Sequence, residues 1–271
     1  MDSFGHRRFR KGCGMNVKER DLIGAAFGSA SDYDRNARFQ HDVACDLATR
    51  ISALDLPPNP RILEIGCGTG FLTQALIAAG VGGEWLVTDI APGMIERCKA
   101  RLGETPKRRF AVLDGEYGLP ERGSFDLVCS NLAMQWFDNQ DLSIGRMLNS
   151  LRPGGHCLFT TLGAGTFAEW AEAHAAQGLK VGTRRFASLA ELEALHVRTR
   201  VGDLIVQKHV EQHENALAFL RSLRAIGAGT PQSTHRPLGP AEMRRVMARF
   251  EDQGAAVTYE VVFGHFRRSL A

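Results

Sequence analysis

The feature that most constrains this chain is a short apolar strand followed by three alternate glycines, within residues 61–71 (RILEIGCGTGF). Gly66, Gly68 and Gly70 permit a tight turn and a close approach of backbone to ligand, where any Cβ would intrude. A helix expected from Phe71 would present unpaired N–H groups at the same place. This pattern is typical of a loop that binds a nucleotide-type cofactor at the end of a strand.

A second strand-like segment supports a nucleotide-type ligand at this loop. Residues 85–89 (WLVTD) end in an acid, and Asp89 lies 23 residues after Gly66. A carboxylate at this distance accepts both hydroxyls of a ribose. Ile90, the next residue, is included in the predicted cofactor site.

The spacing of the glycines indicates which ligand the loop takes. In dinucleotide-binding loops the third glycine comes one residue later, and an anionic pyrophosphate sits at the helix N-terminus. Here Glu64 stands two residues before Gly66. A buried acid would repel a pyrophosphate, whereas it would attract a ligand that carries an ammonium and a sulfonium group.

The segment from Glu64 to Gly70 (EIGCGTG) resembles motif I of the class I S-adenosylmethionine methyltransferases. Residues 110–115 (FAVLDG) look like that family's strand-end acid that contacts adenine, and residues 124–131 (SFDLVCSN) look like its fourth strand. The resemblance implies S-adenosyl-L-methionine as the cofactor. No metal is expected, because His209 and His213 lie four residues apart with no third ligand nearby. The predicted cofactor-binding residues are Glu64, Gly66, Gly68, Gly70, Asp89, Ile90, Asp114, Gly115 and Asn131.

Strand and helix patterns alternate through the middle of the chain, which predicts an α/β protein with a parallel sheet covered on both faces. Strands are expected near 61–65, 84–89, 108–113, 124–130, 156–161, 200–207 and 258–263, and helices near 70–79, 91–102, 140–151, 166–177, 188–195, 214–226 and 240–251. The resemblance implies a Rossmann-like class I methyltransferase fold, with a seven-stranded, mostly parallel sheet whose last strand is antiparallel. An N-terminal helical lid and a helical insertion complete this expectation.

The expected organisation is a disordered leader at residues 1–17 and one methyltransferase domain at 18–271. Within that domain we expect N-terminal helices at 18–56, a cofactor-binding core at 57–165, and a segment facing the substrate and its carrier at 166–271. Val43, Leu47, Ile51 and Leu54 recur on one helical face before the Pro57-Pro58 stop.

Composition places the chain among ordinary globular proteins, since 44% of its 271 residues are hydrophobic and 23% are charged. No apolar run approaches the roughly 18 to 20 residues that span a bilayer, and no signal-peptide pattern opens the chain. We therefore expect a cytoplasmic protein without membrane association. The six cysteines are scattered without C-x-x-C pairs, which indicates reduced thiols and no zinc site.

Charge is unevenly distributed along the chain. Residues 56–179 hold 10 Lys and Arg against 13 Asp and Glu, whereas residues 180–271 hold 14 against 9. The late basic segment could meet an acidic partner, or its arginines could simply be solvated on helix surfaces. Nucleic-acid binding is not expected, because the excess is small.

Methyl transfer requires the nucleophile to be held in line with the methyl group and water to be excluded. A carboxylate nucleophile is already ionised near neutral pH, so no general base is needed. Arginine or tyrosine side chains would position such an anion, and apolar residues would seal the site. Tyr33, Gln135 after the fourth strand, and the pair Arg184-Arg185 are the candidates for this work.

The segments around these candidates resemble the BioC-type malonyl-acyl-carrier-protein O-methyltransferases of biotin synthesis, over about residues 18–268. The matching stretches include 130–136 (SNLAMQW), 159–166 (FTTLGAGT), 223–228 (LRAIGA) and 258–264 (TYEVVFG), with Gln40 in the N-terminal region. The resemblance implies methylation of the free carboxylate of a malonyl thioester, on acyl carrier protein or on coenzyme A, which lets fatty-acid synthases elongate the chain toward pimelate.

Under this resemblance the catalytic residues are Tyr33, Gln135 and Arg185. Tyr33 matches the family's tyrosine by the active site, and Arg185 matches the arginine expected to hold the malonyl carboxylate. Arg184 stands where the family usually has an asparagine, and the segment 230–237 is shorter than the family's insertion.

Other functions remain open from the sequence. The chain could use the same cofactor on another small acid or on a protein side chain, and a mitochondrial factor that hydroxylates arginine resembles the same family. It could also be a cofactor-binding regulator without turnover. A nucleic-acid methyltransferase is disfavoured, because residues 131–134 (NLAM) lack the Asn-Pro-Pro-aromatic tetrad that stacks a flipped base.

Overall fold

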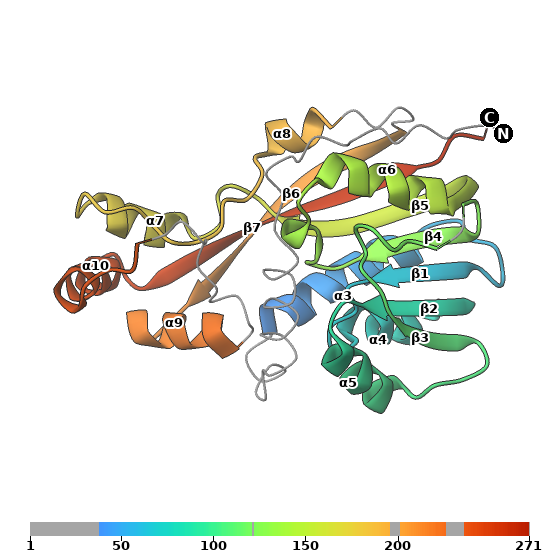
Figure 1. The fold of residues 1–271 in the computed structure, drawn as a ribbon, viewed down its shortest axis with the longest axis horizontal. Helices are drawn as coiled ribbons and strands as arrows, with labels where there is room; N and C mark the ends of the chain where they lie inside the picture. The colour runs from blue at the N-terminus through green and yellow to red at the C-terminus, as the bar shows by residue number, and fades with distance from the viewer. Residues whose placement is uncertain (1–37, 121, 196–200, 226–235, 271) are drawn as a thin grey trace, which may run out of the picture.

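A computed structural model describes residues 38–120, 122–195, 201–225 and 236–270 (Figure 1). The predicted leader, Tyr33 and most of the predicted N-terminal helical segment lie outside these residues. The strands are β1 (Arg61–Ile65), β2 (Glu84–Asp89), β3 (Arg108–Val112), β4 (Phe125–Ser130), β5 (Leu151–Leu162), β6 (Val201–Gln212) and β7 (Ala256–Arg267). The helices are α3 (Arg38–Ser52), α4 (Phe71–Ala78), α5 (Pro92–Leu102), the 3-10 turn η1 (Met134–Trp136), α6 (Gln140–Ser150), α7 (Ala168–Ala175), α8 (Leu189–Glu193), α9 (Ala216–Ala225) and α10 (Pro240–Asp252).

The strands form one seven-stranded sheet in the order β3-β2-β1-β4-β5-β7-β6. Strands β1 to β5 are parallel, and β7 is antiparallel to both β5 and β6. The predicted fold class and the antiparallel last strand are confirmed. Successive strands are added on one side of β1 up to β3, and from β4 onward on its other side. A crevice is therefore expected at the carboxyl ends of β1 and β4, where this order switches.

Helices cover both faces of the sheet (Figure 1). Helices α3, α4 and α5 pack on one face, and α6 packs on the other. Val43, Leu47 and Ile51 of the predicted apolar stripe lie in α3 and are each at most 1% exposed, whereas Leu54 follows the helix and is half-buried. This burial holds α3 against the sheet beside the expected crevice.

Strands β5, β6 and β7 are longer than predicted. Residues 151–155, which precede the strand predicted at 156–161, lie inside β5, because the end of β7 supplies partners: Gly154 donates to the Arg268 carbonyl at 2.9 Å, and Arg268 donates to the Gly155 carbonyl at 3.0 Å. At its other end, the β6–β7 pair runs beyond the parallel strands, and α7, α9 and α10 gather around it (Figure 1). An aromatic cluster that includes Phe219 and Phe250 fills the space between these helices.

No helix in the described ranges is both long and apolar enough to cross a bilayer. The predicted boundaries between leader, lid, core and late segment stay predictions. Four of the five cysteines within the described residues are buried, and all five are free thiols.

Candidate cofactor and substrate site

The glycine loop turns sharply at the end of β1. Gly66 and Gly68 have φ values of 70° and 53°, a region that side chains disfavour. A Cβ on Gly66 would lie 2.6 Å from the Cβ of Ala133, in the loop that follows β4. The two loops therefore approach closely enough that only glycine fits at this position.

Gly70 lies where α4 packs closely against α5, and its predicted role in cofactor binding stays a prediction. It begins α4 with φ at 95°, and a Cβ there would lie 2.8 Å from the Cys98 sulfur in α5. Gly70 is not among the described residues that line the cavity at this loop. Its glycine lets α4 pack against α5, which fixes the direction of the loop.

Asp89 ties the end of β2 to the glycine loop. One carboxylate oxygen accepts the Gly68 N–H at 2.9 Å and the other accepts the Ala91 N–H at 2.9 Å. Burial raises the pKa of Asp89, while these backbone hydrogen bonds oppose that rise. Each carboxylate oxygen retains further acceptor capacity, so both can still receive ligand hydroxyls.

Glu64 is a buried acid directly beneath the loop. Its side chain is 1% exposed and accepts a hydrogen bond from the Thr73 hydroxyl in α4. Burial, with a smaller contribution from the nearby charge of Asp89, raises the pKa of Glu64 to about 7. A positively charged ligand group here would favour the ionised form, which fits a ligand that carries an ammonium or a sulfonium.

Asp114 and Gly115 bring the end of β3 to the same place. Asp114 accepts the Glu116 N–H at 2.9 Å, which closes a turn after the strand. A Cβ on Gly115 would lie 2.2 Å from the Ile65 side chain, so only glycine allows this approach. Because Gly115 has no side chain, the turn packs directly against the end of β1 and forms one wall of the cavity.

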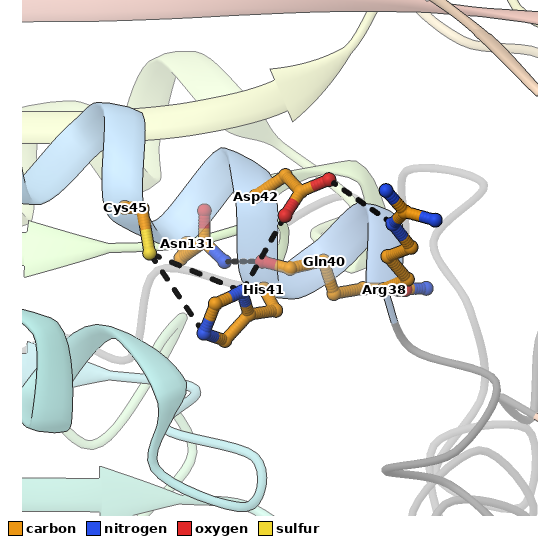
Figure 2. Close-up of polar contacts among 6 residues, drawn as sticks. All are labelled: Arg38, Gln40, His41, Asp42, Cys45 and Asn131. Carbon is orange, nitrogen blue, oxygen red and sulfur yellow. Dashed lines mark hydrogen bonds and ion pairs between the residues drawn. The ribbon is translucent and has the colours of Figure 1, made fainter.

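Asn131 joins β4 to the first turn of α3. Figure 2 shows its amide reaching the Gln40 carbonyl, at 3.2 Å. Its oxygen accepts the Thr160 hydroxyl at 2.8 Å, and the Thr160 oxygen in turn accepts the N–H of Leu132 at 2.8 Å. Leu132 is held with φ at 50°, a conformation that non-glycine residues rarely adopt. These bonds fix the loop that carries Gln135.

The first turns of α3 also carry polar contacts between side chains of the helix itself, on the side away from the cavity. In Figure 2, Arg38 pairs with Asp42 at 4.0 Å, and His41 lies between Asp42 and Cys45. These side chains are exposed or half-buried, and they are not among the cavity-lining residues of the described chain.

Two glutamines of the cavity wall bury acceptors without partners. Gln135 donates to the Leu132 carbonyl at 2.6 Å, but among the described residues its side-chain oxygen has no hydrogen-bond partner. The buried side-chain oxygen of Gln40 likewise has no hydrogen-bond partner among the described residues. Because a buried acceptor without a partner is costly, this wall suits a ligand that brings hydrogen-bond donors.

One cavity connects all these elements at the carboxyl ends of β1, β2 and β4. Towards the C-terminal half of the chain its wall becomes aromatic: Tyr259 stacks on Phe39 with ring centroids 4.0 Å apart, and Phe167 meets Tyr259 edge-on at 5.2 Å. Burial raises the pKa of Tyr259 far above its usual value, so this hydroxyl stays protonated. The predicted site residues that line the cavity are Glu64, Gly66, Gly68, Asp89, Ile90, Asp114, Gly115, Asn131 and Gln135.

Comparison with known proteins identifies the family. A model described as "Methyltransferase domain" matches residues 62–155. A malonyl-[acyl-carrier protein] O-methyltransferase from Magnetococcus marinus is 40% identical, over 92% of this chain and 93% of that protein. The chain belongs to the malonyl-[acyl-carrier protein] O-methyltransferase family. The predicted family is therefore confirmed, and with it the class of S-adenosyl-L-methionine-dependent methyltransferases.

Another relative of this methyltransferase is longer. The biotin biosynthesis bifunctional protein BioCD from Bordetella avium is 41% identical over 91% of this chain, and the chain spans about half of that protein (52%). Among solved structures, a Haemonchus contortus phosphoethanolamine N-methyltransferase 2 in complex with S-adenosylhomocysteine matches with a TM-score of 0.60 at 17% identity, over 94% of this chain and 61% of that one. The Bacillus subtilis protein YcgJ matches with a TM-score of 0.59 at 14% identity, over 82% of this chain and 97% of that one. These two likenesses show the fold alone.

The methyltransferase differs from the predicted site at its substrate end. Arg185 is not among the described cavity-lining residues: its side chain is 71% exposed and pairs with Glu191 at 2.6 Å. Its neighbour Arg184 does line the cavity. Tyr33 lies outside the described residues, and its predicted role stays a prediction.

The predicted site also omitted much of the aromatic wall. Phe39, Phe71 and Tyr259 line the cavity, as does Phe137. Residue type gave no signal for them, because aromatic residues are equally common in cores. The contact between the start of α3 and β7 could be known only from the fold.

Proposed function

We propose that this chain transfers a methyl group from S-adenosyl-L-methionine to the free carboxylate of a malonyl thioester carried by acyl carrier protein. The product would be the methyl ester that enters pimelate and biotin synthesis. The observation that carries this proposal is the 40% identity with a malonyl-[acyl-carrier protein] O-methyltransferase over 93% of that protein. The cavity supports it, since it combines an acidic cofactor end with an aromatic end that contains a guanidinium group.

The acidic end would hold the cofactor. Glu64 would face positive charge on the ligand, because its raised pKa reflects burial without a compensating cation. Asp89 would receive the ribose hydroxyls, and the Asp114-Gly115 turn would border the adenine. When bound, the cofactor supplies an electrophilic methyl: the new bond to a carboxylate oxygen forms as the sulfur–methyl bond breaks, the electron pair stays on sulfur, and no proton moves.

The residues of the chain would therefore position the substrate and exclude water. No general base is required, because the malonyl carboxylate is ionised near neutral pH. Phe39, Phe167 and Tyr259 form a wall with little access for water, each partly or fully buried. An apolar wall favours a reaction in which an anion and a cation neutralise one another.

Intact-mass spectrometry of the carrier tests the proposal. Malonyl-acyl carrier protein, incubated with enzyme and S-adenosyl-L-methionine, should gain the mass of one CH₂ unit. Acetyl-acyl carrier protein, which lacks the carboxylate, should stay unchanged, and malonyl-coenzyme A should show how far the carrier matters. The variant Asp89→Ala should bind the cofactor weakly and lose turnover.

Two results would contradict the proposal. An unchanged malonyl carrier, with cofactor binding intact, would favour another acceptor or a regulator without turnover. A gain of one oxygen atom on a protein target would favour hydroxylation.

A further inference from the structure

Arg184 brings positive charge to the wall of the cavity. Among the described residues that line it, Arg184 is the one lysine, arginine or histidine. The same lining includes four carboxylates, Glu64, Asp89, Asp114 and Glu116. A substrate carboxylate entering this cavity needs a cation to offset both desolvation and repulsion from these acids.

Arg184 is held at the aromatic end of the cavity by its segment. Residues 181–187 run between α7 and α8, and a bridge between Gly163 and Ala187 joins them to the end of β5. Phe186 packs edge-on against Phe167 with centroids 6.3 Å apart. Phe186 and Ala187, the two residues at the C-terminal end of this segment, are therefore anchored to the wall of the site.

The guanidinium of Arg184 is also placed from the other wall. Its central carbon lies 5.7 Å from the centroid of the Trp136 ring, within the range of a cation–π contact. Trp136 ends the turn η1, which follows β4 at the carboxyl edge of the sheet. The arginine thus spans from the late segment to the loop that carries Gln135.

Arg185 is engaged elsewhere. Its pair with Glu191 at 2.6 Å belongs to the start of α8, where Glu191 and Ser188 form a capping box. The Ser188 N–H and then Arg185 lower the pKa of Glu191 to about 2. Arg185 therefore neutralises a helix cap on the surface, and its exposed position explains why it does not reach the cavity.

From this geometry we infer that Arg184, and not Arg185, holds the substrate carboxylate. This rests on the proposed function, in which the substrate is a carboxylate. The planar guanidinium can donate two parallel hydrogen bonds to both carboxylate oxygens, which fixes the plane of the carboxylate and leaves lone pairs on each oxygen for attack. Contact with Trp136 would hold the guanidinium in one orientation.

The test compares binding of malonyl-coenzyme A and acetyl-coenzyme A, which differ by the carboxylate, in the presence of S-adenosylhomocysteine. Calorimetry on the wild type should show a preference for the malonyl form of at least about tenfold. Arg184→Gln should abolish this preference, and Arg185→Gln should keep it. Arg184→Lys should keep part of it, because it retains charge without the two-pronged geometry.

Controls separate the possible causes. All variants should bind S-adenosylhomocysteine within about threefold of the wild type and should unfold at similar urea concentrations, since neither arginine is buried. In turnover assays Arg184→Gln should lower kcat/KM at least about a hundredfold, and Arg185→Gln should not.

The outcomes distinguish this inference from the proposed function. A lost preference in Arg185→Gln, with the preference retained in Arg184→Gln, would overturn the inference, and so would a wild type with no preference. A wild type that prefers malonyl-coenzyme A but never methylates a malonyl carrier would overturn the proposed function, while the binding ratios would still decide between the two arginines.

Discussion

The buried acid beneath the glycine loop should make the stability of this protein depend on pH in a measurable way. Burial raises the pKa of Glu64 from an ordinary 4.5 to about 7. Between these two values the folded state holds the proton more tightly than the unfolded chain does. The free energy of unfolding therefore falls as pH rises through this window, and the contribution of the neutral acid is lost above about pH 7.

The magnitude follows from the two pKa values. With one group at 4.5 in the unfolded chain and about 7 in the folded protein, the free energy of unfolding should fall by about 2.5 kcal/mol between about pH 5 and about pH 8. Glu64→Gln removes the ionisation. The cost of burying the amide is the same at both pH values, so it cancels from the pH difference.

Urea unfolding followed by tryptophan fluorescence at the two pH values measures this difference. The pH-dependent loss in the wild type should exceed that in Glu64→Gln by about 2.5 kcal/mol. Glu96→Gln, which removes an exposed acid from α5, controls for the loss of one negative charge. If the free energy of unfolding changes with pH by the same amount in wild type and Glu64→Gln, within about 0.5 kcal/mol, the raised pKa of Glu64 is refuted.

Cofactor affinity should carry the opposite dependence. A cationic ligand prefers the ionised acid, so calorimetry should show S-adenosyl-L-methionine binding strengthen from about pH 6 towards about pH 7.5 in the wild type and stay level in Glu64→Gln. Wild-type binding that weakens over this range would contradict a role for Glu64 beside positive charge.

Three further predictions follow from single positions. Gly66→Ala should weaken cofactor binding at least about tenfold in calorimetry, because φ is 70° and the new Cβ would meet Ala133 at 2.6 Å; near-normal binding would show that the loops can separate. Gly264→Ala should lower the free energy of urea unfolding by about 1 to 3 kcal/mol, because its Cβ would lie 2.3 Å from the Phe159 ring, and an unchanged midpoint would count against this packing. Burial lowers the pKa of His156 from 6.5 to about 4, so the free energy of unfolding should fall as pH drops from about 6.5 to about 4. His156→Gln should reduce this loss, measured as the shift of the urea midpoint; equal shifts in both proteins would contradict a contribution from His156.

Much of the cofactor end could be predicted from consecutive residues. The strand before Gly66 and the acid that ends β2 each express a local requirement, namely an apolar run, a small residue, or a carboxylate at a fixed spacing. Asp114 was predicted from the resemblance to the methyltransferase family. The alternation of strands and helices likewise predicted the sheet, because burial on both faces leaves a continuous apolar signal. Even so, the extent of β5 was missed, since the turn-like Pro153-Gly154-Gly155 is paired by the distant end of β7.

The sequence by itself determined that a glycine loop and the acid that ends β2 would meet at one edge of a parallel sheet, because those constraints are steric and local. Only the tertiary structure decided which of two adjacent arginines lines the cavity. That choice depends on the Gly163–Ala187 bridge and on the helix cap at Glu191, which both hold the chain just after the two arginines. Side chains one residue apart in an extended segment take opposite directions, and no local pattern specifies which direction is inward.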